Sequence, residues 1–204
     1  MSERSVPMEK SALLLCDLQN DFLHPDGAYG RAGQSNPDIA ALPARLKPLV
    51  ELFRKQGGLI GATLFTLVPG KGGEPMISPH LKKLRPFLSK GDFAPGGWGQ
   101  ALVDELQPAD FSVEKIAYSA FYMTRLEWVL RMQGVKKLYF AGIVTNGGVA
   151  STVRDAQVRD FDCTVLEDGC AAFSQAVHRA AIEGLRPVAA ITTIGEVFRE
   201  LAAS

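Results

Sequence analysis

Short apolar runs alternate along the chain with longer segments in which apolar residues recur at helical spacing. The apolar runs, which we expect to be strands, are residues 11–16, 59–65, 112–114, 138–141, 163–166 and 189–192. The segments of helical spacing are residues 37–56, 124–133, 149–160, 175–183 and 195–202. Because strands that alternate with helices usually form a parallel sheet covered on both faces, the pattern predicts an α/β fold.

The alternation extends over nearly the whole chain, and 204 residues are enough for one well-buried domain. We therefore expect a single domain over residues 1–204, with residues 1–10 as an N-terminal tail. Residues 68–98 break the pattern because they are rich in proline and glycine, with a short helix expected at residues 80–88. A loop of this length is usually functional, so we interpret it as a flap over the site or a surface used in oligomerisation.

Composition narrows the range of partners. The chain has 22 basic and 22 acidic side chains, so its formal net charge is zero. Such a chain has no long-range field to attract nucleic acid or an anionic membrane, and we expect neither as a partner. No run of about 18 apolar residues occurs, and the polar start lacks the apolar core of a signal peptide. These features favour a cytoplasmic protein that binds a small molecule or another protein.

The three cysteines indicate neither a disulfide framework nor a zinc cluster. Their number is odd, and no C-x-x-C pair or neighbouring histidine at metal spacing accompanies them. Cys16 and Cys163 lie in apolar runs, where a free cysteine usually behaves as a small buried hydrophobe. Cys170 comes just past a strand end, where its side chain could face the site.

Polar residues follow several of the expected strands. Asp17 ends the first strand, Lys115 ends the third, and Thr145 with Asn146 follows the fourth. Because open parallel sheets bind ligands outside the carboxyl ends of their strands, we predict that these groups converge on one pocket. The loop of residues 143–149 also lies at a strand-to-helix corner, where the first N–H groups of a helix can hold an anion or oxyanion.

Two charged residues are the main candidates for chemistry. Asp17 can act as a general base, or as a general acid if burial raises its pKa; the alternative is a carboxylate that caps a helix or braces a loop. Asp21, in the same segment, is interpreted as a loop brace. Lys115 would keep Asp17 ionised and stabilise negative charge on the substrate, and the alternative is a solvated surface lysine.

A series of short motifs occurs in order along the chain: Asp17-Leu-Gln-Asn-Asp-Phe22, Pro95-Gly-Gly-Trp98, Lys115 with Tyr118-Ser-Ala-Phe121 and Thr124, Gly142-Ile-Val-Thr-Asn146, Thr152-x-Arg154-Asp-Ala156 and Asp168-Gly-Cys-Ala-Ala172. With this order and spacing, the chain from about residue 11 resembles the isochorismatase-like hydrolases, also called the cysteine hydrolase superfamily. The resemblance implies a three-layer α/β/α fold around a Rossmann-like, mostly parallel sheet, here of six strands. It also implies assembly as homodimers or homotetramers, and an Asp, Lys and Cys triad that cleaves small amides.

The resemblance assigns the triad to Asp17, Lys115 and Gly148, and so places glycine at the position of the nucleophilic cysteine. Covalent attack by a thiolate is therefore not available. The family resemblance also implies a cis peptide between Val144 and Thr145. This chain resembles the isochorismatases proper in that departure. They also have glycine at this position and hydrolyse a vinyl ether with the aspartate as proton donor. Their loop sequence differs from that of residues 145–149, so isochorismate itself is not the expected substrate.

Loop residues and aromatic side chains would complete the pocket. Asn146 and the N–H groups of residues 147–149 would hold the oxyanion. The aromatic members would form an apolar wall, although a buried core would use the same residue types. The expected substrate-binding residues are Gln19, Phe22, Trp98, Tyr118, Phe121, Thr145, Asn146, Gly147 and Val149.

Neither a metal nor a cofactor is expected. The nicotinamidase branch of the family that the chain resembles binds a metal through Asp-x-His-x-x-His, and the equivalent strand end, residues 63–68, contains none of these ligands. His24 and His80 are isolated in loop sequence, and His178 lies in an expected helix. We interpret each as a surface or packing histidine, because a lone histidine lacks the partners of a metal site or proton relay.

Three hypotheses for function follow. The preferred one is a hydrolase that cleaves an amide, ester or vinyl ether of a small metabolite, using Asp17 and Lys115 with water in place of a cysteine nucleophile. The second is a catalytically inactive family member that binds a metabolite or a partner protein in the same pocket. The third is an amidohydrolase in which mutagenesis has replaced the nucleophilic cysteine by Gly148.

Overall fold

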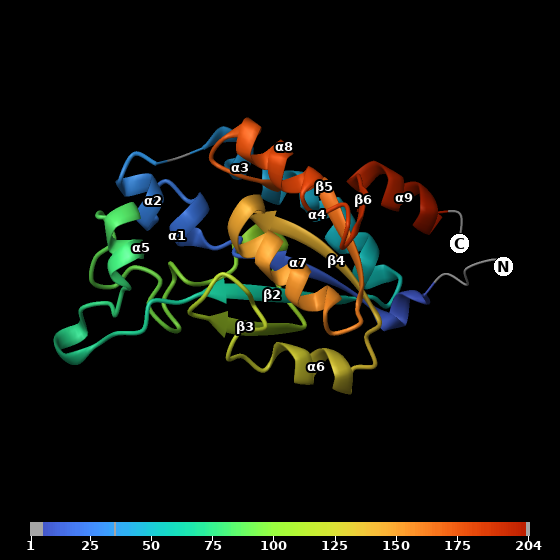
Figure 1. The fold of residues 1–204 in the computed structure, drawn as a ribbon, viewed down its shortest axis with the longest axis horizontal. Coiled ribbons are helices and arrows are strands. Elements are labelled where there is room, and N and C mark those ends of the chain that lie inside the picture. Colours follow the sequence, from blue (N-terminus) through green and yellow to red (C-terminus); the bar gives the residue numbers. More distant parts are fainter. Residues whose placement is uncertain (1–5, 35, 203–204) are drawn as a thin grey trace.

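The protein, described here by a computed structural model over residues 6–34 and 36–202, is built on one sheet with helices on both faces (Figure 1). All six strands pair in parallel, in the order β3-β2-β1-β4-β5-β6. This arrangement confirms the predicted α/β/α fold with a Rossmann-like parallel sheet. The strands are β1 Ser11–Cys16, β2 Leu59–Phe65, β3 Phe111–Lys115, β4 Lys137–Ile143, β5 Asp162–Ala171 and β6 Ala190–Thr192.

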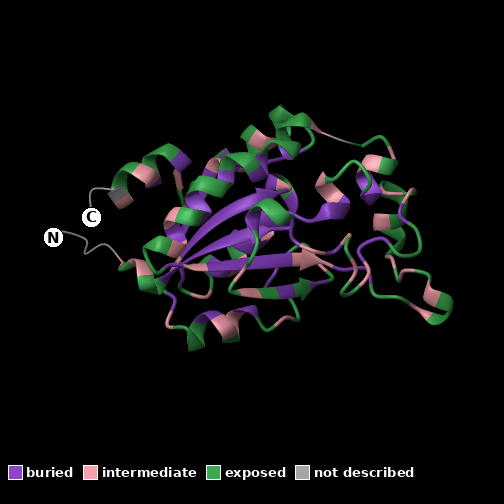
Figure 2. Cartoon of the chain, turned by 180° about the vertical axis from the view of Figure 1, so that it is seen from behind, coloured by how far each residue is buried: buried purple, intermediate pink, exposed green. Residues whose placement is uncertain are grey.

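The helices that cover the two faces of the sheet leave their outer sides exposed (Figure 2). Helices α6 and α7 contribute to one apolar cluster, and α4 and α9 contribute to the other. None of the helices in the described part of the chain is long and apolar enough to cross a membrane. The helices are α1 Asn20–Leu23, α2 Ala28–Arg31, α3 Pro37–Ala40, α4 Leu42–Lys55, α5 Pro79–Leu84, α6 Leu126–Met132, α7 Ala150–Gln157, α8 Gln175–Glu183 and α9 Ile194–Ala202.

The central strand β1 shows why the sheet is buried on both sides. Every residue of β1 is buried, and successive side chains point to opposite faces because a strand has a period of two. Leu14 belongs to the cluster on the face of α6 and α7, whereas Leu13 and Leu15 belong to the cluster on the face of α4. The uninterrupted apolar run that predicted this strand is therefore the signature of a strand covered on both faces.

Some element boundaries differ from those expected. The segment 37–56 forms two helices, α3 and α4, because Pro43 lacks an N–H and favours the first turn of a new helix. Strand β5 continues past residue 166 to Ala171, because its pairing with β4 resumes after a register shift. Of the expected tail, residues 1–5 lie outside the described residues, and Met8–Lys10 forms a 3₁₀ turn that leads into β1.

The proline- and glycine-rich segment 68–98 contains the short helix α5, which ends at Leu84 rather than at residue 88. Its Phe93 packs in a third apolar cluster with Tyr29 of α2. The Asp21 carboxylate accepts hydrogen bonds from the N–H groups of Ala28 and Phe93, at 2.8 and 2.6 Å. Asp21 is thus the loop brace that the sequence predicted, and it ties the segment after β1 to the inserted loop.

Gly142 in β4 offers a test of how closely the strands must approach. It has a φ of 122°, and a Cβ at this position would lie 2.1 Å from the carbonyl oxygen of Cys16. We expect Gly142→Ala to lower the free energy of unfolding by about 3 to 5 kcal/mol, through backbone strain and overlap together. The control is Gly134→Ala, where φ is 70° and a Cβ would meet no atom within 4 Å; its expected cost is about 1 to 2 kcal/mol. Equal losses of unfolding free energy in the two variants, measured by urea denaturation, would contradict the role of close packing.

Candidate active site

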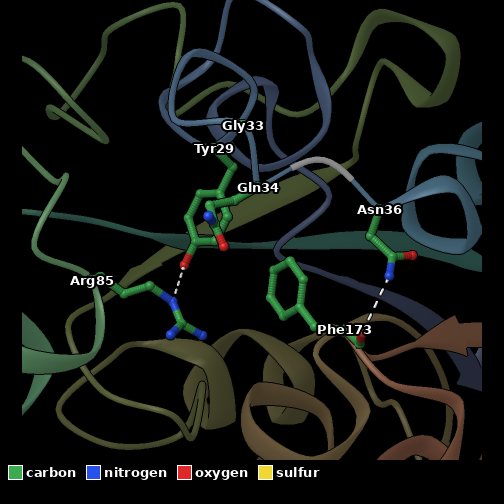
Figure 3. Close-up of a pocket in the computed structure, with 6 residues that line it drawn as sticks. All are labelled: Tyr29, Gly33, Gln34, Asn36, Arg85 and Phe173. Atoms are coloured by element: carbon green, nitrogen blue, oxygen red, sulfur yellow. Dashed lines mark hydrogen bonds between the residues drawn. The ribbon is translucent and has the colours of Figure 1, made fainter.

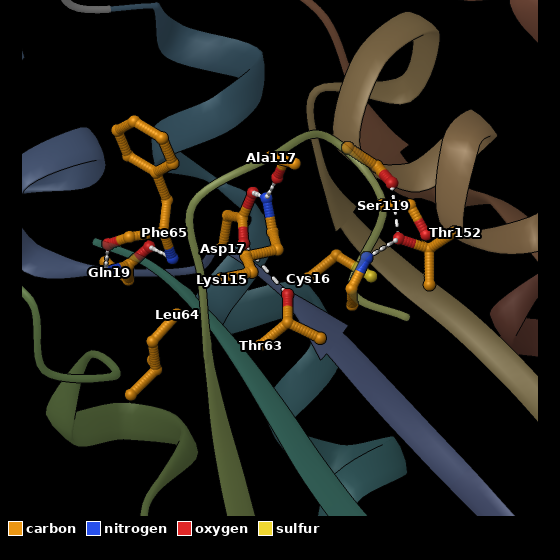
Figure 4. A network of polar contacts seen from close by, with 12 residues as sticks. Cys16, Asp17, Gln19, Thr63, Leu64, Phe65, Lys115, Ala117, Ser119 and Thr152 are labelled. Carbon is orange, nitrogen blue, oxygen red and sulfur yellow. Dashed lines mark hydrogen bonds and ion pairs between the residues drawn. The ribbon is translucent and has the colours of Figure 1, made fainter. Parts of the chain in front are cut away.

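Asp17 lies directly after β1 and forms the centre of a buried polar network (Figure 4). Its Oδ2 is 2.7 Å from the Lys115 Nζ, and its Oδ1 accepts a hydrogen bond of 2.8 Å from the Thr63 hydroxyl. Its φ of 55° is in the left-handed region, which is uncommon for residues other than glycine and concentrates at functional sites. The backbone therefore turns sharply at the strand end to aim the carboxylate at its two partners.

Lys115 is the last residue of β3 and is 3% exposed, which excludes the alternative of a solvated surface lysine. Its Nζ also donates to the carbonyl oxygen of Ala117 at 3.1 Å and lies 5.6 Å from the centre of the Phe65 ring. A buried ammonium needs such partners because the loss of hydration is costly. The two charged candidates from the sequence are thus brought together as a single ion pair.

The environment of Asp17 shifts its acidity. Burial raises the pKa of this carboxyl above its ordinary value, while the Lys115 ammonium and the Thr63 hydroxyl oppose the shift. A raised pKa in a group that is also paired with a cation is typical of residues that exchange protons during a reaction. The geometry and the raised pKa together make Asp17 a candidate for proton transfer.

Gly148 faces this ion pair from the loop between β4 and α7. A Cβ built on Gly148 would lie 3.0 Å from the Asp17 Oδ2 and 3.7 Å from the Lys115 Nζ. Any side chain at position 148 would therefore point directly at both charged groups. The structure places the three predicted positions together, with backbone in place of a nucleophile at the third.

The loop that carries Gly148 is fixed by side chains from neighbouring helices. Residues Thr145–Val149 form a π turn, in which the buried Thr145 hydroxyl lies 2.8 Å from the Nδ1 of His178 on α8. On α7, the Thr152 hydroxyl donates to the Gly148 carbonyl oxygen at 2.7 Å and accepts the N–H of Ala120. Sequence reasoning missed His178 as a loop-positioning residue, because only the packing of α8 beside this turn brings the two together.

The donors expected for an oxyanion are partly used by the loop itself. The N–H groups of Gly147 and Val149 both donate to the Val144 carbonyl oxygen, at 2.9 and 3.3 Å. The Asn146 side chain is exposed. The non-proline cis peptide joins Ile143 to Val144, one bond earlier than predicted. The N–H groups of Gly147 and Val149 are therefore used by the loop, which leaves that of Gly148 as the remaining candidate of the three.

Three of the expected substrate-binding residues are buried, with contacts to the core or to neighbouring strand ends. Gln19 is fully buried and bonds through its amide to the backbone of Phe65 and to the carbonyl oxygen of Gln100, so it braces the strand ends. Phe121 and Val149 are buried in the apolar cluster beneath α7. Their apolar side chains gain more from burial in this core than from exposure in a pocket.

The other aromatic candidates lie nearer the surface. Tyr118 is 56% exposed, and a Cβ on Gly147 would come within 3.2 Å of its ring, so glycine is needed where the ring covers the loop. Trp98 is 52% exposed and meets the ring of His24 edge-on at 5.0 Å. Phe22 packs against the ring of Tyr29 at 4.8 Å. Tyr118 is thus the aromatic residue placed directly over the candidate site.

None of the three cysteines provides a substitute nucleophile. Cys16, Cys163 and Cys170 are all buried in the apolar cluster beneath α7, which corrects the expectation that Cys170 could face the site. Burial raises the pKa of Cys163 and of Cys170 to about 12. Such thiols are protonated at neutral pH and unreactive. Among residues 6–34 and 36–202, no group of three His, Cys, Asp or Glu side chains gathers to hold a metal ion.

A cysteine introduced at position 148 tests this geometry directly. We expect the thiol of Gly148→Cys to be alkylated by iodoacetamide at pH 7 at least about ten times faster than the native cysteines, because it would lie beside the Lys115 ammonium and face the site. After labelling of the folded variant, mass spectrometry of the intact chain should show one added group. The unmodified chain is the matched control and should remain unlabelled. Labelling of both chains at the same rate would contradict this placement.

Comparisons with known proteins agree with this fold. The model of the isochorismatase domain matches residues 11–196. Ureidoacrylate amidohydrolase RutB of Azorhizobium caulinodans is 33% identical over 196 residues, which cover 91% of this chain and 83% of that protein.

Solved structures with similar folds include a cysteine hydrolase from Pseudomonas syringae pv. phaseolicola, with a TM-score of 0.82 at 24% identity over 100% of this chain and 99% of that one. N-carbamoylsarcosine amidase from Thermoplasma acidophilum has a TM-score of 0.72 at 24% identity, over 91% of this chain and 96% of that one. The domain match over nearly the whole sequence, on this parallel sheet, shows that the chain belongs to the isochorismatase-like hydrolase family.

Proposed function

We propose that the protein hydrolyses a C–N or C–O bond of a small metabolite, with Asp17 and Lys115 acting on water in place of a cysteine nucleophile. The observation that carries the proposal is the position of Gly148. A Cβ there would lie 3.0 Å from Asp17 Oδ2 and 3.7 Å from Lys115 Nζ, so the position that faces both charged groups carries no side-chain nucleophile, and water has to supply the attacking oxygen. A buried carboxylate of raised pKa is suited to accept a proton from that water.

The reaction of an amide or ester would begin with the ionised form of Asp17. Its carboxylate takes a proton from water as the water oxygen bonds to the substrate carbonyl carbon, and the carbonyl oxygen becomes an oxyanion. Lys115 and the Gly148 N–H stabilise the new negative charge. When the carbonyl re-forms, the C–N or C–O bond breaks, and the proton on Asp17 passes to the leaving nitrogen or oxygen. Asp17 returns to its ionised form, so one water is consumed for each bond cleaved.

The names of the similar proteins favour amides within this class. Ureidoacrylate amidohydrolase and N-carbamoylsarcosine amidase are both named for the cleavage of amide-type C–N bonds in carbamoyl compounds. Small carbamoyl amides are therefore the first substrates to test, followed by esters and vinyl ethers. For a vinyl ether, Asp17 would act first as the acid, since protonation of the substrate precedes the attack of water.

Gly148 also supports a second candidate function, that of a binding protein that keeps the pocket and has lost catalysis. The two functions differ in a measurable way. A binding protein would give saturable binding of a small amide in calorimetry with no product formed, and its affinity would not require the proton-transfer capacity of Asp17.

Loss of the carboxylate should abolish turnover. We expect Asp17→Asn to lower kcat/KM on the best substrate of an amide, ester and vinyl ether panel by about 100-fold or more, because proton transfer in the transition state is lost. Product formation would be followed by chromatography. The control is Asp21→Asn, which changes a carboxylate that braces a loop; folding of both variants would be checked by their melting temperatures.

An unchanged rate in Asp17→Asn would contradict the proposal, as would inactivity of the unmodified chain over the whole panel. Gly148→Cys provides the remaining comparison. Amidase activity that appears only in that variant would indicate that the chain has lost a cysteine nucleophile and does not catalyse hydrolysis with water alone.

The pH profile should report the environment of Asp17. A general base works only when ionised, so activity on amides should fall as the pH drops through the pKa of Asp17. Because burial raises this pKa, the fall should lie above the ordinary carboxyl pKa of about 3.9. Thr63→Val removes a hydrogen bond that stabilises the ionised form, so it should raise the pKa further and move the fall to higher pH. A profile of log(kcat/KM) that is identical in both proteins would contradict this assignment.

A further inference from the structure

A cavity of about 330 Å³ lies beside the inserted segment and is lined by Tyr29, Gly33, Gln34, Asn36, Arg85 and Phe173 (Figure 3). We propose that this space, the Arg85 cavity, binds the carboxylate of the substrate, so that the protein acts on small acids rather than on neutral amides or esters. The inference rests on the proposed function and names the substrate class of the same site. The volume is at the lower end of that of small-molecule sites, about 300 to 1,000 Å³.

Arg85, at the end of α5, is held in a fixed orientation. Its Nε donates to the Tyr29 hydroxyl at 2.8 Å, and one of its terminal nitrogens donates to the Leu84 carbonyl oxygen at 3.0 Å. The guanidinium carbon lies 5.8 Å from the Tyr29 ring centre and 5.6 Å from that of Phe173. The two rings are stacked, with centres 5.6 Å apart and planes at 10°. A planar guanidinium that is held in this way is already oriented to receive a planar anion.

The charge of the cavity favours an anion. Within residues 6–34 and 36–202, Arg85 has no ion pair, whereas nearby Arg31 is paired with Asp92. The remaining residues that line the cavity are neutral. Arginine with a carboxylate is one of the strongest pairs in proteins, because two parallel N–H groups match two oxygens. The geometry therefore leaves one positive charge facing the cavity without a carboxylate of this chain.

Tyr29 adds a second donor. Burial raises the pKa of this phenol, and its hydroxyl accepts the N–H of Arg85, so its own proton is free to be donated to a ligand. Asn36 donates through its side-chain amide to the carbonyl oxygen of Phe173, and so links the chain after α2 to the end of β5. These contacts support a cavity that is built, with its polar groups held in place, rather than a chance gap between loops.

A row of packed aromatic rings links the cavity to the ion pair. The ring of Tyr29 contacts that of Phe22, which in turn packs 6.1 Å from the ring of Phe65, and Phe65 lies beneath the Lys115 ammonium. The Asp17 carboxylate contributes to the raised pKa of Tyr29, after burial. Tyr29 thus lines the cavity and also lies within the electrostatic reach of Asp17, which is the link that the proposal requires between the carboxylate site and the scissile bond.

Calorimetry with a matched pair of probes tests the proposal. N-carbamoylglycine and its uncharged primary amide share the same carbamoyl group and differ in the carboxylate. We expect the unmodified protein to bind the acid at least about 10-fold more tightly than the amide. Arg85→Gln should weaken binding of the acid by about 10- to 100-fold and leave binding of the amide unchanged. Lys83→Gln removes an exposed positive charge from the same helix and should keep the preference.

A second variant tests the proposal even if Arg85→Gln fails to fold. Tyr29→Phe keeps the aromatic ring and removes the hydroxyl, and it should weaken binding of the acid by about 3- to 10-fold. The proposal is overturned if neither probe binds, if both bind alike, or if folded Arg85→Gln keeps the preference. Preference for the acid without any turnover would overturn the proposed function alone, and hydrolysis of amides without this preference would overturn the carboxylate site alone.

Discussion

The buried ion pair between Asp17 and Lys115 is the interaction on which the site depends. Removing two charges from water costs several kcal/mol for each ion, and only close, well-oriented partners offset that cost. The partners come from three strands: Asp17 follows β1, Thr63 lies in β2 between them, and Lys115 ends β3. The register pairs Cys16 with Thr63 and Phe65 with Lys115. A slip of one residue in either ladder would turn a charged side chain to the other face of the sheet.

The site therefore uses the sheet for its charges and the loops for its shape. The strands are covered on both faces by apolar clusters, and their positions leave little freedom to the carboxylate and the ammonium. By contrast, the turn that carries Gly148 is held by the buried hydroxyls of Thr145 and Thr152, and so by side-chain hydrogen bonds instead of the sheet ladder.

The sequence was sufficient to predict the strands and the positions of Asp17, Lys115 and Gly148. Each of these depends on local apolar runs or on residues beside a strand end. The sequence did not predict that Gln19 and Phe121 are buried, since a residue near a site can equally fill the core or brace a loop, and only packing decides. It gave no sign of Arg85, whose partners Tyr29 and Phe173 lie far from it in the chain. Contacts of that kind depend on how the inserted segment folds back, and no periodicity of the sequence predicts them.

A site without a thiol has one further consequence. An enzyme that depends on a reactive cysteine is inactivated when peroxide converts the thiolate to sulfenic and then to irreversible sulfinic and sulfonic acids. Here position 148 is glycine, and the remaining cysteines are buried, with the pKa of Cys163 and Cys170 raised to about 12. None of them presents a thiolate for this chemistry at neutral pH. With glycine at position 148 and its cysteines buried, the site thus offers no thiolate for peroxide to oxidise.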